Sequence, residues 1–395
     1  MSVPNGQTLA PMIQGVNAPN VVIDNRAFYA ATRRLRFPMQ SAKVFSGIGT
    51  TDSIQLKQTG IVAALEVRVA GNITFGGTIG TTTASYEWPF NLVQNFKLSA
   101  NGQSNLISAR GLTIRALDFV TSTGLNDRGV SKTFGAVVQT QGTLALGCDD
   151  WGTLTTNIIA PGANVAAVGV YTVDLTYFIP VAADQISLIG AVYAQSSATN
   201  LTLEIQWATQ AQAFSAVGGA ATVAYNLTWD VTGLAYSIPQ VGNNFVVPDL
   251  SQFHQVTETR VGGLTQGVNE IKLPGVGTGR KWLRTLFNVY SSAAPLPVTD
   301  ANFSQLAWAF GGNDVPETYS SGGKIRAWNE RITGVDLGRN WGLVLWDFAS
   351  TFALRDVVDM GSTSDLRVLI GLVNSPTTGY TQVAQETLFS AATGA

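Results

Sequence analysis

Two stretches of this sequence share one pattern of residues 211 positions apart. The first runs from Gln94 through an Asn-Gly turn to Ile114-Arg115-Ala116, and the second runs from Gln305 through a Gly-Asn turn to Ile325-Arg326-Ala327. In both stretches an apolar strand precedes the turn, and about a dozen residues later a short amphipathic segment begins just past a glycine. The shared order of strand, turn, loop and short helix indicates that one architectural unit is used twice.

The composition favours strands over helices. Hydrophobic residues make up 45% of the 395 residues, which is enough for buried cores, whereas only 12% are charged and glycine occurs 41 times. This mixture is typical of strands joined by tight turns. A surface with so few charges is poorly solvated in a free monomer, so we expect other protein subunits to cover much of it.

The charge, cysteine and histidine counts exclude several classes of function. A formal net charge of -2 gives no general attraction for nucleic acid. Cys148 is the single cysteine, which excludes an intrachain disulfide and a thiolate metal cluster. His254 is the single histidine, no Gly-x-Ser-x-Gly motif accompanies it, and metal sites with two imidazoles are excluded. The sequence therefore predicts no enzyme, with no catalytic, cofactor-binding or metal-binding residues, and a structural role for His254.

A strict alternation of apolar and polar residues predicts strands with one face on a core. In the stretch 63–69, for example, Leu65, Val67 and Val69 share one face while Glu66 and Arg68 share the other. The same alternation predicts strands over 201–207, 172–179 and 223–230 in the first half. Less strict patterns predict a second set over 282–290, 305–310, 342–348 and 366–373.

Long loops between short strands favour Greek-key sandwiches over a meander. The longest loop, rich in glycine and threonine, spans 121–157, which is a length usually reserved for functional or interfacial loops. About eight strands in each half match a jelly roll, in which two four-stranded sheets face each other. We therefore predict an all-β fold with short helices in the loops and five parts: an arm with a short basic helix (1–42), a first jelly roll (43–236), a linker (237–247), a second jelly roll (248–387) and a tail (388–395).

The arm carries a basic segment. A helix is predicted over 25–36, with Asp24 or Asn25 as its N-cap and Pro38 beyond its end. Against Asp24, four arginines give this segment a net charge of +3; they are Arg26, Arg33, Arg34 and Arg36. Aromatic residues lie among them, so the segment is suited to an anionic lipid headgroup layer. Docking on a neighbouring subunit, with arginines paired to carboxylates, is an equally good interpretation. No signal peptide or transmembrane segment is expected in the chain, which predicts a product that stays soluble in the cytoplasm.

Several other motifs are candidates for a binding or catalytic site or for a packing contact. The glycine-rich stretch 275–281 lacks the spacing of a phosphate-binding loop, and a flexible hairpin or strand-entry loop is the better interpretation. Paired carboxylates occur at Asp149-Asp150 beside Trp151, at Asp314 with Glu317, and at Asp356 with Asp359; solvated charge explains them more simply than a glycosidase cleft does. Arg115 and Arg326 lie on the two short helices of the repeat. We expect those helices to occupy equivalent places and to mediate packing between sandwiches or between trimers.

Four short motifs carry a family resemblance. They are Phe90-Asn91-Leu92-Val93-Gln94, Phe214-Ser215-Ala216-Val217-Gly218, Gly60-Ile61-Val62 and Pro248-Asp249-Leu250-Ser251. With the order of elements, they make the chain resemble the major capsid protein of tectiviruses, bacteriophages whose coat belongs to the double jelly-roll lineage of the adenovirus hexon. The local motifs cover the chain up to Gly311.

The resemblance implies a structural protein of the virion. Its expected partners are two further copies in a pseudo-hexagonal homotrimer, neighbouring trimers in an icosahedral phage shell, minor capsid and vertex proteins, and the lipids of an internal membrane that the arm faces. It implies no cofactor, no direct contact with nucleic acid, and assembly in the host cytoplasm. The alternative is a two-domain carbohydrate-binding β-sandwich protein that uses the loop 148–151.

Overall fold

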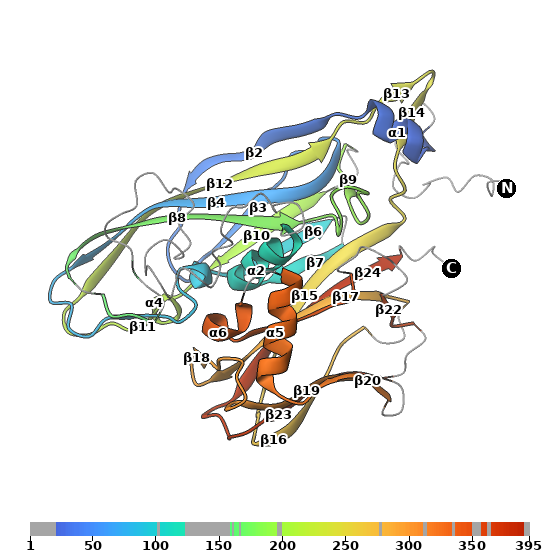
Figure 1. The fold of residues 1–395 in the computed structure, drawn as a ribbon. Helices are drawn as coiled ribbons and strands as arrows, with labels where there is room; N and C mark the ends of the chain where they lie inside the picture. Colours follow the sequence, from blue (N-terminus) through green and yellow to red (C-terminus); the bar gives the residue numbers. More distant parts are fainter. Residues whose placement is uncertain are drawn as a thin grey trace.

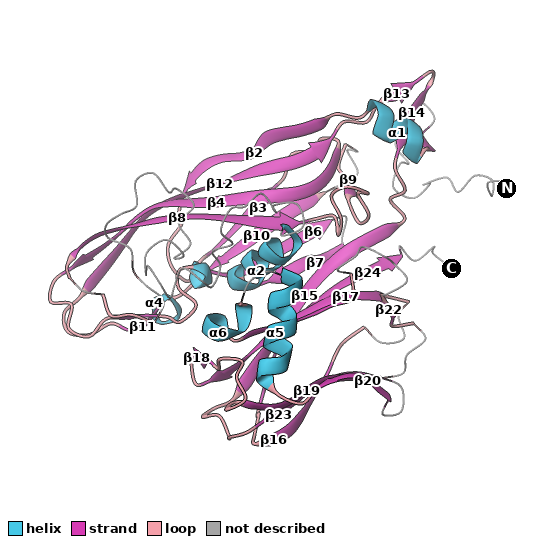
Figure 2. Cartoon of the chain, in the orientation of Figure 1, coloured by secondary structure: helices cyan, strands magenta, loops and turns pink. Residues whose placement is uncertain are grey.

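The structure is a computed structural model, and strands dominate it while the helices are short (Figure 2). It describes residues 21–100, 103–122, 159, 162–165, 167–195, 200–275, 279–310, 314–333, 336–349, 357–361 and 365–390.

The first half contains strands β1 (Val21–Ile23), β2 (Arg34–Val44), β3 (Thr51–Gln55), β4 (Ile61–Gly76), β5 (Thr83–Ala84), β6 (Val93–Ala100), β7 (Gln103–Ala109), β8 (Gly169–Pro180), β9 (Val192–Tyr193), β10 (Leu201–Trp207), β11 (Phe214–Ala216) and β12 (Thr222–Tyr236). Its helices are α1 (Asn25–Ala31), the 3-10 helix η1 (Phe90–Leu92), α2 (Gly111–Ser122) and α4 (Gln210–Ala213).

The second half contains strands β13 (Gln240–Val241), β14 (Asn244–Val247), β15 (Gln252–Gly262), β16 (Gly267–Lys272), β17 (Lys281–Ser291), β18 (Ala294–Pro295), β19 (Phe303–Phe310), β20 (Asp314–Tyr319), β21 (Leu343–Asp347), β22 (Val358–Asp359), β23 (Leu366–Leu372) and β24 (Tyr380–Ser390). Its helices are α5 (Gly322–Thr333) and α6 (Leu337–Trp341).

The long strands of the first half form a jelly roll, here called the first sandwich. One layer, the five-stranded sheet, has the order β2-β12-β4-β8, and β9 also pairs with β4. The facing layer has the order β7-β6-β10-β3. Strands far apart in the sequence are therefore neighbours, as in a Greek key: β2 pairs with β12, and β3 pairs with β10.

The second half repeats this order strand for strand and is called the second sandwich. One layer has the order β15-β24-β17, with β21 on the other edge of β17. The facing layer, the four-stranded sheet, has the order β16-β23-β19-β20. The long strands in the described part of each half can be numbered 1 to 8 along the chain. In both halves their spatial order is then 1-8-3-6 in one layer and 2-7-4-5 in the other. The predicted duplication and the double jelly roll are both confirmed.

The two sandwiches are joined through one sheet. The edge strand β7 of the first sandwich pairs in parallel with β15 of the second, through Ile107 with Val256 and Ser108 with Thr257. This pairing merges two layers into one ten-stranded sheet, and the layers then stack as three sheets across the molecule (Figure 1). The sequence predicted two sandwiches but not this shared sheet.

The predicted strands all appear, and their alternation follows burial. In β10, Leu201, Leu203, Ile205 and Trp207 are buried, while the residues between them are exposed or half-buried. β21 is buried on both faces: Val344 and Trp346 face the core of the second sandwich, whereas Leu343 and Leu345 join the large apolar cluster of the first. Burial on both faces explains why the strands of the second half alternate less strictly.

The predicted basic helix is too long at its C-terminal end. Asp24 caps α1 by accepting a hydrogen bond from the backbone N–H of Ala27, at 2.9 Å. The helix ends at Ala31, and Thr32 is already extended. Arg34 and Arg36 lie in β2, because this stretch pairs with β12 through backbone hydrogen bonds that a helix here would exclude.

The expected domain boundaries fall within or beside strands, and β24 crosses the limit between residues 387 and 388. β2 crosses the limit between residues 42 and 43. The expected linker 237–247 contains β13 and β14, which form a small three-stranded sheet with β1, and α1 contacts this sheet. The division of the chain into an arm, two jelly rolls, a linker and a tail stays a prediction.

Candidate functional site

The contact between the two sandwiches is the most elaborate polar arrangement in the described part of the chain, and one of its centres is Arg110. This residue lies between β7 and α2 of the first sandwich. Its Nε lies 2.6 Å from Oε1 of Glu258 on β15, and its backbone N–H donates to Oε2 of the same carboxylate at 2.9 Å. Its Nη1 donates to Tyr290 of β17 at 3.0 Å and also contacts Glu87. One buried guanidinium therefore links both sandwiches.

His254 is the centre of a second buried cluster at the same contact. Its Nδ1 lies 3.0 Å from the carbonyl oxygen of Pro180, at the end of β8, and its Nε2 lies 2.9 Å from Oε1 of Glu386 on β24. Arg284 of β17 donates to the same carboxylate at 2.9 and 3.1 Å, and its Nε lies 3.0 Å from Asp347. The predicted structural role of the single histidine agrees with this packing.

The charges of these clusters stabilise one another. Burial alone would raise the pKa of Glu386, but the positive charge of Arg284 and the hydrogen bond from His254 outweigh it and lower the pKa to about 2. For Arg110, burial alone would lower the pKa, but Glu258 and Glu87 hold it well above its ordinary value. A buried pair of this kind is costly to break, because removing one partner leaves an uncompensated charge.

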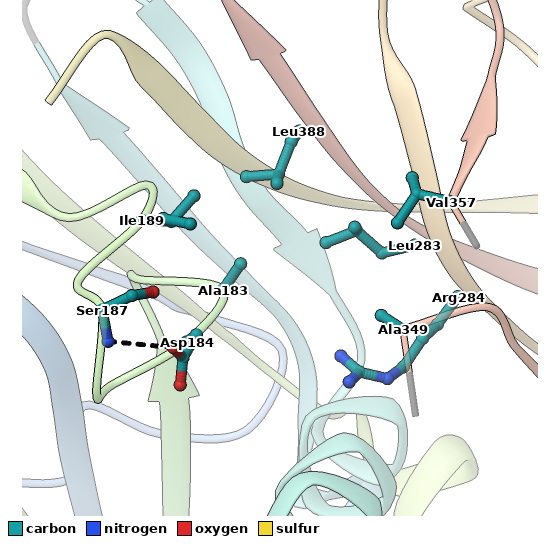
Figure 3. Close-up of a pocket in the computed structure, with 9 residues that line it drawn as sticks. All are labelled: Ala183, Asp184, Ser187, Ile189, Leu283, Arg284, Ala349, Val357 and Leu388. Carbon is teal, nitrogen blue, oxygen red and sulfur yellow. Dashed lines mark hydrogen bonds between the residues drawn. The ribbon is translucent and has the colours of Figure 1, made fainter. Parts of the chain in front are cut away.

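A shallow hollow opens beside the His254 cluster (Figure 3). It has about 390 Å³ of empty space that includes open solvent, and Ala183 and Ile189 of the first sandwich face Leu283 and Leu388 of the second across it. Arg284 forms part of its wall. Because the lining is mostly apolar and its two charged residues, Asp184 and Arg284, are already hydrogen-bonded, the arrangement is that of a packing contact.

The arm arginines lie at the surface. Arg26 is on α1, Arg33 precedes β2, and both are exposed, as is Arg34. Arg36 forms an ion pair with Glu66 of β4, with 65% of the arginine side chain exposed. They lie on or next to α1 and the beginning of β2 (Figure 1), so the structure places all four in one region.

The two arginines of the repeat occupy the same position in their helices. Arg115 and Arg326 are each the fifth residue of a twelve-residue helix. Arg115 donates to the carbonyl oxygen of Thr176 on β8 at 2.9 Å, and Arg326 donates to that of Val298 at 3.4 Å and lies 3.6 Å from Asp336. Each arginine therefore fastens its helix to its own sandwich.

The remaining sequence candidates do not form a site. Cys148, Asp149, Asp150, Trp151 and Asp356 lie outside the described residues. Asp314 and Glu317 are on the edge strand β20, where Glu317 accepts hydrogen bonds from Trp308 and Tyr319; Asp359 accepts one from the backbone of Gly361. The stretch 275–281 connects β16 to β17, as a loop was predicted to.

The described residues hold no further candidate for a metal site or a membrane-spanning helix. Among these residues, no group of three or more histidine, cysteine, aspartate or glutamate side chains is arranged to hold a metal ion. Within the same part of the chain, no helix is both long enough and apolar enough to span a membrane.

Sequence reasoning missed the charged residues between the sandwiches. Arg284 and Glu386 each lie in a strand between buried residues, and Glu258 follows a buried run in β15. A charged residue at a buried strand position is a signal that it has a partner. The sequence does not say which of the chain's charged residues that partner is.

The family model of the P3 major capsid protein N-terminal domain matches residues 40–237, which is half of the chain. A search of curated proteins finds no match.

Solved structures of viral capsid proteins share the fold over nearly the whole chain. The major capsid protein of Sulfolobus Turreted Icosahedral Virus is 17% identical, with a TM-score of 0.64, over 90% of this chain and 96% of that chain. The PBCV-1 virus capsid protein is 13% identical, with a TM-score of 0.53, over 90% and 93%. The major capsid protein P2 of bacteriophage PM2 is 10% identical, with a TM-score of 0.50, over 92% and 99%.

The structural similarity establishes the fold, and the family match covers the first sandwich together with the strand pairing that defines it. The chain belongs to the P3 major capsid protein family and is a double jelly-roll major capsid protein, a component of the virion.

Proposed function

We propose that this chain forms homotrimeric, pseudo-hexagonal capsomers that tile the icosahedral shell of a bacteriophage. The observation that carries the proposal is that the two sandwiches have the same strand order and are joined through one sheet. Three such chains present six similar blocks, which fit a position with six neighbours using only three subunits. Expected further partners are minor capsid and vertex proteins, and assembly is expected in the host cytoplasm.

The role is structural, without catalysis and without direct binding of nucleic acid. The net charge of -2 supports this proposal, since it provides no general attraction for a polyanion. The polar clusters between the sandwiches also support it, because their charged groups already bind one another.

The oligomeric state tests the proposal most simply. Light scattering on the purified protein in size-exclusion chromatography should give about three times the 41.8 kDa mass of one chain. The mass of a single chain at every concentration tested would contradict the capsomer.

The arm is proposed to face an internal membrane. Exposed arginines at positions 26, 33 and 34 lie near exposed apolar residues of the same region, Val22, Ile23 and Tyr29. Cationic and apolar groups together are what an anionic lipid surface attracts. The competing role is docking on carboxylates of a neighbouring subunit.

Vesicle flotation separates these two roles. The trimer should float with vesicles containing phosphatidylglycerol and should remain at the bottom when Arg26, Arg33 and Arg34 are all changed to serine. Loss of the trimer in this variant, with no flotation of the native protein, would instead favour docking on a neighbouring subunit. As a control, Lys272→Ser removes an exposed cation from β16 and should leave flotation unchanged.

A further inference from the structure

The helices α2 and α5 are counterparts in the two sandwiches. They begin at Gly111 and Gly322, 211 positions apart, and each follows the fifth long strand of its sandwich. α2 contacts β6 and β8, and α5 contacts the matching strands β19 and β21. Residues 211 positions apart therefore occupy equivalent places on the two helices.

Their burial differs on one face. On α2, a stripe at positions 113, 116, 117 and 120 is buried, and Leu117 is only 2% exposed. The equivalent stripe on α5 is exposed and consists of Lys324, Ala327, Trp328 and Arg331. Trp328, the counterpart of Leu117, is 43% exposed, and its ring lies 5.8 Å from the guanidinium of Arg331. A large exposed aromatic side chain beside a cation is typical of a protein interface.

Residues of the second sandwich bury the apolar stripe of α2. Ala116, Leu117 and Val120 belong to one apolar cluster that continues into α6 and into the outward face of the second sandwich. The members of the cluster from that sandwich include Leu286, Trp341, Leu343, Leu345 and Ala384. In Figure 1, α2 lies between the sheets of the first sandwich and the helices α5 and α6. The sheet that takes part in this contact contains β15, β17, β21 and β24.

The counterpart of that sheet in the first sandwich is the five-stranded sheet, whose outward face carries exposed residues such as Arg68, Asn226 and Thr228. Arg68, Asp174 and Asp230 form a polar cluster on this face, in which Arg68 donates to Asp174 at 2.7 and 3.0 Å. Two carboxylates here face one arginine. Burial and the negative charge of Asp174 raise the pKa of Asp230 despite the nearby Arg68. This face has room for further positive charge.

The sheet edges repeat the same relation. Within the chain, β7 pairs with β15. The counterpart of β7 is β20, which ends the four-stranded sheet, and the counterpart of β15 is β2, which ends the five-stranded sheet. β20 carries Asp314 and Glu317, and β2 carries Arg34 and Arg36. The counterparts of β7 and β15 therefore both lie at sheet edges and carry opposite charge.

We propose that the stripe Lys324-Ala327-Trp328-Arg331 of α5, together with the edge of β20, docks on the outward face of the five-stranded sheet of a second copy of this chain. The contact repeats, between subunits, the contact that α2 and β7 make with the second sandwich within one chain. It rests on the proposed trimer and assigns the surfaces that hold the trimer together. Because each copy offers one docking stripe and one receiving sheet, the contact is head-to-tail, which allows the three copies of the proposed trimer to close into a ring.

Photo-crosslinking from position 328 tests these surfaces directly. Trp328 is replaced by p-benzoylphenylalanine, and isotopically light and heavy subunits are mixed so that peptides joined between copies are recognised by mass. The expected crosslinks join residue 328 of one copy to strands β2, β4, β8 or β12 of another. A trimer whose crosslinks from residue 328 fall elsewhere would overturn the proposed surface while leaving the trimer intact. A protein that remains a single chain would instead overturn the trimer itself.

A pair of variants adds a quantitative test. Trp328→Asp should raise the concentration for half-assembly at least about tenfold, since aromatic residues central to an interface contribute most of its affinity. Val268→Asp places the same charge at an exposed position of β16. This strand lies at the edge of the four-stranded sheet opposite to β20, so the variant should leave that concentration unchanged. Because both side chains are exposed, circular dichroism of the two variants should match that of the native protein. Equal assembly of the two variants would contradict the proposal.

Discussion

At the scale of single residues, a few buried polar groups determine how the sandwiches fit together. Glu386 interacts with both Arg284 and His254, and His254 also contacts the end of β8. These contacts connect three strands of the second sandwich to the first. A single ionisable side chain at this place therefore influences the stability of both halves.

Acid should weaken this contact through Glu386. The pKa of Glu386 is about 2 in the folded chain against an ordinary value of 4.5, so the folded state favours the ionised carboxylate. Its contribution to stability is complete above about pH 5 and is lost as the pH falls toward 2. The free energy of unfolding in urea, measured from pH 5 to pH 3, should therefore fall more steeply for the native protein than for Glu386→Gln. Parallel curves for the two proteins would contradict this role.

Trp207 tests the packing of the first sandwich. Its side chain is 1% exposed, packs edge-on against Phe45 with ring centres 4.9 Å apart, and donates from Nε1 to Asp52 at 2.8 Å. Trp207→Ala should lower the free energy of unfolding by about 3–5 kcal/mol. Trp207→Phe keeps an aromatic ring and loses the hydrogen bond, so its loss should be smaller, about 1–3 kcal/mol. Denaturant unfolding measures both; a loss below about 1 kcal/mol for the alanine variant would show that the strand faces the other way.

At the scale of elements, alternation in the sequence predicted strands such as β4, β10 and β17, but not β2, β15 or β24, and it did not predict which strands pair. The pairing of β7 with β15 is parallel and involves only two residue pairs, so no local sequence pattern predicts it. The end of α1 was misjudged for a related reason, since Arg34 and Arg36 suit a helix but are held in β2 by pairing with β12. The 211-residue repeat did predict the equivalent helices, because duplication preserves the order of elements even where side chains have diverged.

The connection between β7 and β15 depends on Arg110. Its side chain is 14% exposed and is bound by Glu258 and Glu87, so Arg110→Met should cost about 3–5 kcal/mol by leaving buried carboxylates without a cation. Arg36→Met removes an ion pair at the surface and should cost less than about 1 kcal/mol. Urea unfolding of the two variants under one set of conditions makes the comparison. Similar losses for both would mean that the Arg110 cluster does not hold the sandwiches together.

At the scale of the whole molecule, the architecture combines two equivalent blocks with unequal surfaces. Within one chain the first sandwich covers the outward face of the second, whereas residues on the outward face of the five-stranded sheet, such as Arg68 and Thr228, and the stripe on α5 are exposed. The sparse charge of the sequence was the signal that such surfaces exist. Their location could not be predicted, because it depends on which copy of the repeated unit is covered within the chain.

The central claim is that three copies of this chain arrange six sandwiches in a ring. Cryo-electron microscopy of the purified assembly measures this most directly, since it shows the number of lobes and their symmetry. The account predicts a three-fold particle with six lobes of similar size, in which α5 of each subunit meets the five-stranded sheet of the next. A particle with another number of subunits, or three-fold particles in which α5 faces solvent, would contradict it.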